Sequence, residues 1–329
     1  MAVLRALIIA AAAVPIAGWL TGIASETGDA IGSLLLPALV VAVAALLPIG
    51  GRARRSHWLA VAALVLVGTA AIGPEVAARL ARAPVDTNRS ERLVVVTHNV
   101  SVANVAAEAT LAALLASDAD VILLQEVDGS FAAMLPRLRA RYRWSNPCVR
   151  RCSLAIFARL PMERVRYRLR DPGGRAFGPP LLQTILHPPG RAPVPLLTLH
   201  LTWPIPAGPQ RKARIALARA IGAVPFARAI LTGDFNSTPW SHAMRRLDAD
   251  MAPLQRITRM VPSWPARLRG TPVLPAFLPI DHIFVGPDWQ VASVERLGRT
   301  GSDHLPIRAV LVAGNPAPAM PRAAEPRSR

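Results

Sequence analysis

Three uncharged apolar runs restrict how the N-terminal segment of the chain can fold. They extend from Ala6 to Ala24, from Ile31 to Ile49 and from Trp58 to Pro74. Each approaches the ~20 residues that a helix needs to cross a bilayer core. A single segment inside lipid must form its backbone hydrogen bonds within itself, and a helix does so. A cleaved signal peptide would explain only the first run, and two more follow it. We therefore expect residues 1–83 to form an anchor of three transmembrane helices.

The charges between these runs predict the orientation of the anchor. Arg52, Arg54 and Arg55 separate the second run from the third, whereas Glu26 and Asp29 lie between the first and the second. Because short arginine-rich loops stay in the cytoplasm, we expect a multi-pass protein of a bacterial inner membrane with its C-terminal part in the periplasm. The arginines after the third run favour the opposite orientation, although large domains cross membranes largely regardless of charge.

Charge and cysteine content limit the partners and the kinds of site. The formal net charge is +18, almost all of it from arginine, since Lys212 is the only lysine. Such a surface attracts phosphate-bearing partners, although a GC-rich genome would produce the same composition. The two cysteines, Cys148 and Cys152, exclude a cysteine zinc site. They are either free thiols or one short-loop disulfide formed outside the cytoplasm.

Beyond the anchor, short apolar runs alternate with helical patterns such as Val105 to Ala116 and Gln210 to Ala223, which indicates an α/β domain. We expect a linker over residues 84–92, a catalytic domain over 93–313 and a disordered tail over 314–329. Several runs end in polar residues at places where a rigid strand could present them to a ligand. These residues are Asn99, Glu126, His200, Asp234, Asn236, Asp281, Asp303 and His304.

The polar endings, taken in chain order, resemble the motifs of the endonuclease/exonuclease/phosphatase superfamily. The motifs are Thr-His-Asn ending at Asn99, Leu-Gln-Glu ending at Glu126, His-Leu from His200, Gly-Asp-Phe-Asn ending at Asn236, Ile-Asp-His ending at His282 and Ser-Asp-His ending at His304. The Ser-Thr-Pro-Trp sequence after Asn236 is similar to a bacterial membrane-anchored branch. The resemblance implies a four-layer α/β sandwich of two packed mixed sheets flanked by helices.

The resemblance also implies a metal site. Glu126 is the expected ligand of Mg²⁺, with Mn²⁺ as the alternative, because these hard cations prefer oxygen donors. Asn99 would either add a neutral oxygen or hold Glu126, and Asp303 resembles a further ligand. The alternative without a function is that Glu126 is a solvated carboxylate at a strand end.

Five residues resemble the family's catalytic set. Asp234 would orient and deprotonate the attacking water, and Asn236 would donate to a phosphate oxygen or hold the nucleophile. His200 and His304 would flank the phosphate, with Asp281 as the partner of His304. The alternative for the Asp234 to Asn236 segment is an Asx-turn that caps the following helix.

Three further histidines are expected to be structural or exposed. His282, His187 and His242 fall in this group. The alternative for His200 is a packed residue beside Trp203. No His-Glu-x-x-His motif is present, which argues against zinc.

The sequence therefore predicts a membrane-anchored, metal-dependent hydrolase that cleaves a phosphoester of nucleic acid, of a phospholipid head group or of a small molecule. Its expected partners are this substrate and the lipid bilayer, and we infer no protein partner. The alternative function is a non-catalytic membrane protein that binds anionic, phosphate-bearing ligands.

Overall fold

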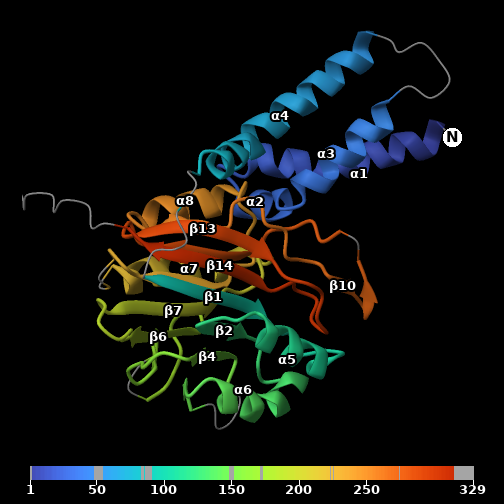
Figure 1. The fold of residues 1–329 in the computed structure, drawn as a ribbon. Helices are drawn as coiled ribbons and strands as arrows, with labels where there is room; N and C mark the ends of the chain where they lie inside the picture. The colour runs from blue at the N-terminus through green and yellow to red at the C-terminus, as the bar shows by residue number, and fades with distance from the viewer. Residues whose placement is uncertain are drawn as a thin grey trace, which may run out of the picture.

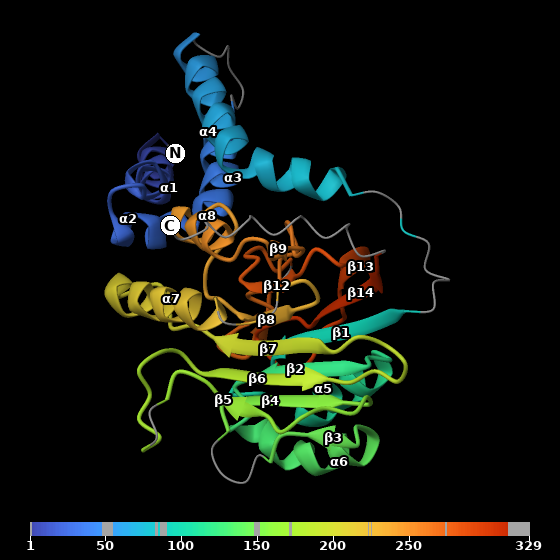
Figure 2. The ribbon, with the colours of Figure 1, turned by 90° about the vertical axis from the view of Figure 1, so that its left-hand side faces the viewer.

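The N-terminal helices stand on one end of the remaining domain (Figures 1 and 2). The computed structural model describes residues 2–47, 55–82, 85, 91–147, 152–170, 173–222, 224, 226–273 and 275–314. The helices are α1 (Ala2–Thr21), α2 (Glu26–Gly32), α3 (Leu35–Leu46) and α4 (Arg55–Leu80). Two helical segments, Val3–Thr21 and Arg55–Leu80, are each long and apolar enough to cross a membrane.

The middle apolar run does not form the continuous span that we expected. It lies in α2 and α3, which are bent by 61° relative to one another at the short break between them. The start of α2 is tied to the rest of the protein, because the carboxylate of Asp29 accepts hydrogen bonds from the backbone N–H groups of His242 and Ala243, both at 2.7 Å.

Two mixed sheets make up the domain that follows. Among the described residues, the first sheet has the order β13-β14-β1-β2-β4-β3 and the second β5-β6-β7-β8-β12-β9. The strands of the first are β1 (Arg92–Asn99), β2 (Val121–Gln125), β3 (Trp144–Ser145), β4 (Leu154–Ala158), β13 (Trp289–Arg296) and β14 (Ile307–Ala313). Those of the second are β5 (Arg166–Tyr167), β6 (Leu181–Leu186), β7 (Val194–His200), β8 (Ile230–Asp234), β9 (Gln255–Arg256) and β12 (Asp281–Val285). A small hairpin joins β10 (Arg267–Leu268) to β11 (Thr271–Pro272).

Helices cover the outer face of each sheet, which confirms the predicted α/β sandwich. The first sheet packs on α5 (Ala107–Ala116), the 3₁₀ helix η1 (Ser130–Met134) and α6 (Leu135–Arg141) through one apolar cluster. The second sheet packs on α7 (Ala207–Ile221) and α8 (His242–Asp250) through another. A third cluster fills the space between the two sheets. Each strand in the middle of a sheet therefore buries both of its faces.

The anchor and the sandwich share polar and apolar contacts. Trp19 Nε1 donates to the Trp240 backbone carbonyl at 2.9 Å, and Trp240 Nε1 donates to Gly32 O at 3.2 Å. On α4, the buried Glu75 forms an ion pair with the fully buried Arg256 at 3.0 Å. Breaking a buried pair of this kind is costly, so the helices are fixed to the domain rather than tethered to it.

Several predicted features lie outside the described residues. Most of the linker and almost all of the tail fall there, as do Arg52, Arg54 and Cys148. Within the described part, β1 begins at Arg92 and β14 ends at Ala313. Cys152 takes part in a disulfide bond.

Candidate active site

The alternation of side chains along β1 directs Asn99 into the space between the sheets. Leu93 and Val95 belong to the inner core, whereas Val94 and Val96 belong to the outer one. Successive side chains of a strand point to opposite faces, so Asn99 shares the face of Leu93 and Val95.

The same alternation brings residues from the second sheet to this place. Ile230 and Ile283 belong to the inner core, so Asp234 and Asp281 lie on the inner face of β8 and β12. Strand pairing sets these residues side by side, with His200 of β7 opposite Asp234 and Asp281 opposite Asp234 from the other side. Five strand ends therefore meet in one polar cluster, because Glu126 follows β2 next to Asn99.

Asn99 joins the two sheets at this cluster. Its amide nitrogen donates to Glu126 Oε1 at 2.9 Å and to Asp234 Oδ2 at 3.0 Å. Its side-chain oxygen accepts from the backbone N–H of Ser101 at 2.9 Å, and Val102 N–H donates to Glu126 Oε2 at 3.0 Å. These contacts favour the role of holding Glu126 over that of offering an oxygen to a cation.

Asp234 and Asn236 lie on a loop with a tight backbone. Asn236 N–H donates to Asp234 Oδ1 at 2.8 Å, which forms the Asx-turn that the sequence offered as an alternative. This turn does not cap the next helix, because α8 begins at His242 with Ser241 as its N-cap. Gly233 adopts a φ of +149°, and a Cβ there would lie 2.1 Å from Leu199 O, so no larger residue fits. Gln210 of α7 supports the loop from behind, because its amide nitrogen donates to Asn236 O at 3.1 Å. Sequence reasoning missed Gln210, whose only signal is a polar residue on the buried face of a helix.

His304 forms a short contact with Asp281, at 2.7 Å between Nδ1 and Oδ2. Its Nε2 lies 3.6 Å from Asp234 Oδ2. Burial opposes the charged ring, but the carboxylates of Asp281 and Asp234 outweigh it and raise the pKa of His304 to about 10. His304 is therefore an imidazolium at neutral pH.

Burial has the opposite effect on the neighbouring carboxyl group. It raises the pKa of Asp234 to about 6, although the charge of His304 pulls that pKa down. Ordinary aspartates ionise well below this range. Asp234 is thus close to a proton-exchange equilibrium near neutral pH, which suits a base.

His200 completes the cluster between the two acidic groups. Its Nε2 lies 3.7 Å from Glu126 Oε1 and 3.6 Å from Asp234 Oδ2. The Asn236 amide nitrogen is 3.3 Å from the same ring nitrogen. Trp203 packs edge-on against Trp264 instead, with ring centroids 5.8 Å apart. His200 is therefore a member of the polar cluster.

Asp303 lies at the border of the cluster. Its Oδ2 accepts from Trp264 Nε1 at 3.2 Å, and its charge is one of those that raise the pKa of His304. The residues whose ligand atoms lie within 4.8 Å of one another are Asp234, Asp281 and His304, so Asp303 is outside this closest group.

The remaining histidines lie elsewhere. His282 Nε2 pairs with Ser237 O at 2.9 Å on the outer face of β12, and His187 pairs with Glu163 at 3.0 Å. His242 Nε2 is 3.0 Å from Trp19 O, beneath the anchor. His98 is buried on the outer face of β1, and burial lowers its pKa to about 3.

A family model covers the segment of the chain that contains these residues. The model, described as "Endonuclease/Exonuclease/phosphatase family", matches residues 96–304, which run from the end of β1 to His304. The chain belongs to the endonuclease/exonuclease/phosphatase family. A search of curated proteins finds no match.

Solved structures share the fold of this family member. An endonuclease/exonuclease/phosphatase from Beutenbergia cavernae is 24% identical, with a TM-score of 0.53, over 69% of this chain and 72% of that one. TDP2 from D. rerio, complexed with a single-strand DNA product, is 17% identical, with a TM-score of 0.56, over 67% and 98%. An endonuclease/exonuclease/phosphatase from Bacteroides vulgatus is 16% identical, with a TM-score of 0.54, over 68% and 100%. These matches show the architecture alone.

The charge of Asp281 controls His304 in this site. We expect Asp281→Asn to lower the pKa of His304 by about 1 to 3 pH units, because it removes the nearest opposite charge. NMR titration of the histidine ring signals in metal-free protein measures this pKa. The exposed Asp118→Asn serves as the control and should leave His304 unchanged. An unaltered titration of His304 in Asp281→Asn would contradict the pairing.

Proposed function

We propose that the protein is a Mg²⁺-dependent hydrolase that cleaves a phosphoester by in-line attack of water. The observation that carries this proposal is the convergence of Asn99, Glu126, His200, Asp234 and His304, from both sheets, in one cluster of hydrogen bonds and close contacts. Phosphoester hydrolysis needs charge neutralisation, a positioned water and donors to the phosphoryl oxygens. The cluster contains side chains for each of these tasks.

The donor set of the cluster fits a hard cation. The cluster contains the carboxylates of Glu126, Asp234 and Asp281, with that of Asp303 at its border. Asp281 Oδ1 is buried with no hydrogen-bond partner among the described residues. His304 belongs to the closest group of acidic and histidine side chains, but its charged ring would repel a cation. We therefore assign Glu126 as the principal ligand, held by Asn99, with Asp303 as a further ligand. The bound cation would offset negative charge on the phosphoryl oxygens.

Asp234 is the base in this proposal. Its Oδ1 is held by the Asn236 N–H, and its Oδ2 faces Asn99, His200 and His304. With its position fixed, the carboxylate can orient a water molecule and accept its proton. The Asn236 amide, next to His200, is placed to donate to a phosphoryl oxygen.

His304 and His200 would stabilise the transition state. The imidazolium of His304 is aligned by Asp281, so its Nε2 presents a fixed positive charge to oxygens that gain negative charge. His200, on the other side of Asp234, can protonate the leaving oxygen. The two rings would therefore flank the phosphate.

The Asp234 carboxylate provides the direct test. We expect full-length wild-type protein with Mg²⁺ to hydrolyse bis-nitrophenyl phosphate, and Asp234→Asn to lower kcat by about 10³-fold, within the range for loss of a general base. Release of nitrophenolate measures the rate. The exposed Asp118→Asn is the matched control and should keep wild-type activity.

Metal removal belongs to the same experiment. Chelation with EDTA should abolish turnover, and added Mg²⁺ should restore it. If wild type and Asp234→Asn are equally inert on nucleic acid, lipid and small-molecule phosphoesters, the non-catalytic binding function replaces this proposal.

We also propose that the N-terminal helices cross a bacterial inner membrane three times, with α2 and α3 together as one bent span, and that the sandwich lies in the periplasm. Apolar residues on the helices are exposed to the surroundings, among them Leu7 and Leu66 at 62% and 70%. The site then lies beside a bilayer, which favours a substrate at or near the lipid surface.

A reporter enzyme tests this orientation. Alkaline phosphatase, which folds only outside the cytoplasm, should be active when fused after Arg329. A fusion within residues 48–54 should be inactive, since short arginine-rich segments between spans stay inside. The reverse pattern of activities would place the sandwich in the cytoplasm.

A further inference from the structure

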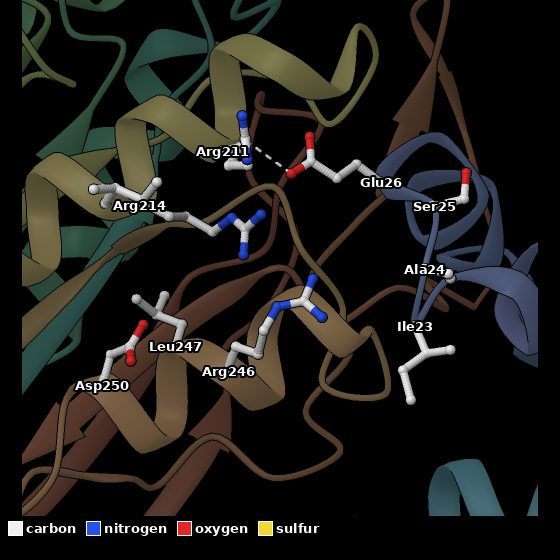
Figure 3. Close-up of a pocket in the computed structure, with 11 residues that line it drawn as sticks. Ile23, Ala24, Ser25, Glu26, Arg211, Arg214, Arg246, Leu247 and Asp250 are labelled. Atoms are coloured by element: carbon white, nitrogen blue, oxygen red, sulfur yellow. Dashed lines mark ion pairs between the residues drawn. The ribbon is translucent and has the colours of Figure 1, made fainter.

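A pocket away from the polar cluster lies where the anchor meets α7 and α8, the helices that cover the second sheet. It has a volume of about 370 Å³ and is bordered by the segment between α1 and α2, by α7 and by α8. Figure 3 shows Arg211 and Arg214 on α7 and Arg246 on α8, with the guanidinium groups of Arg214 and Arg246 pointing into the space between the helices. None of the residues proposed for catalysis lines this pocket.

The arginines of the pocket lack enough anionic partners. Arg211 pairs with Glu26 at 2.9 Å. Arg214 donates from Nη1 to Ala243 O at 3.1 Å, but its buried Nε has no acceptor within the described part of the chain. Arg246 forms no ion pair with any described residue, although Asp250 also borders the pocket. Two guanidinium groups therefore face one cavity without a carboxylate bound to either.

The two guanidinium groups repel one another, and this repulsion contributes to the lowered pKa of Arg214. Burial, followed by the charge of Arg246, lowers the pKa of Arg214, and the carboxylates of Asp29, Glu26 and Asp250 only partly oppose this. An anion in the pocket would relieve the repulsion and supply the missing acceptor. A phosphate group fits best, because a guanidinium binds it through parallel, charge-assisted hydrogen bonds.

The position of the pocket indicates where the phosphate comes from. The pocket begins at Gly22, directly after the helical segment Val3–Thr21 that is apolar enough to cross a membrane. Ile23, just after α1, borders the pocket and is 72% exposed, and Leu20, in the last turn of α1, is 55% exposed. An apolar path thus continues from the cationic pocket along α1. Head groups of lipids lie at this level of a membrane protein, with their acyl chains along the helices.

We propose that Arg214 and Arg246 bind the phosphate group of an anionic phospholipid in this pocket, with the acyl chains along α1. The bound lipid joins the anchor to α7 and α8, because its head group touches all three parts. This site takes a structural lipid, is separate from the proposed hydrolytic centre and does not depend on its activity.

The test uses full-length protein in a neutral detergent and follows thermal unfolding by tryptophan fluorescence. Dioctanoyl-phosphatidylglycerol should raise the Tm saturably, since a ligand of the folded state stabilises it. Dioctanoyl-phosphatidylcholine and inorganic phosphate at equal concentration should raise it far less. In Arg246→Gln the concentration of phosphatidylglycerol for half the effect should increase about tenfold, and Arg214→Gln/Arg246→Gln should lose the effect.

A matched variant controls for net charge. Arg139→Gln/Arg141→Gln removes two arginines from the last turn of α6, in the opposite helical layer, and should respond to phosphatidylglycerol as wild type does. Should the double pocket variant fail to fold, the single Arg246→Gln variant, whose residue is exposed, decides the question.

Three results would overturn the proposal. An equal effect of inorganic phosphate would show a site for free phosphate instead of a lipid. An equal effect of phosphatidylcholine would show that the anionic charge is irrelevant. A phosphatidylglycerol effect of the same size in wild type, Arg246→Gln and the control would show that the lipid binds elsewhere.

Discussion

The strict alternation of side chains along the central strands is the constraint on which the site depends. On β1, β8 and β12, the residues that fill the inner core and the residues that form the polar cluster occupy the same face. A shift of one residue in the pairing of β8 with β12 would expel both Asp281 and the apolar side chains behind it. The apolar core therefore fixes the positions of the polar groups, and catalytic geometry follows from packing.

Burial then gives those groups their chemistry. Two carboxylates and an imidazole lie together out of water, and this arrangement shifts the pKa values of His304 and Asp234. Asp281 keeps His304 charged, and burial holds Asp234 near the pKa of a base at neutral pH. The amide of Asn99 links Asp234 to Glu126 by hydrogen bonds and adds no charge to the cluster. The different neighbours of two similar aspartates thus support two different roles.

Much of this arrangement could be predicted from the sequence, because motif residues such as Asn99 and Glu126 stand directly at the ends of strands. The four-layer sandwich was predicted from the resemblance of these motifs to a known family, because the alternation of strands and helices indicated only an α/β domain. The remainder depends on contacts between distant segments. Asp29 looks like a loop charge, and only the folded chain shows that its carboxylate accepts hydrogen bonds from the first turn of α8. Gln210, Arg214 and Arg246 lie on helices, and the sequence does not show which side chains of two helices will face one another.

The central claim is that Glu126 and its neighbours hold one divalent cation beside His200 and His304. Paramagnetic Mn²⁺, added to protein with labelled histidines, tests it directly by NMR, because it broadens only signals of nearby nuclei. We predict that substoichiometric Mn²⁺ removes the ring signals of His200 and His304 and leaves that of His242, beneath the anchor. In Glu126→Gln the same loss should require at least about tenfold more Mn²⁺. Equal broadening of all three rings, or no dependence on Glu126, would contradict the claim.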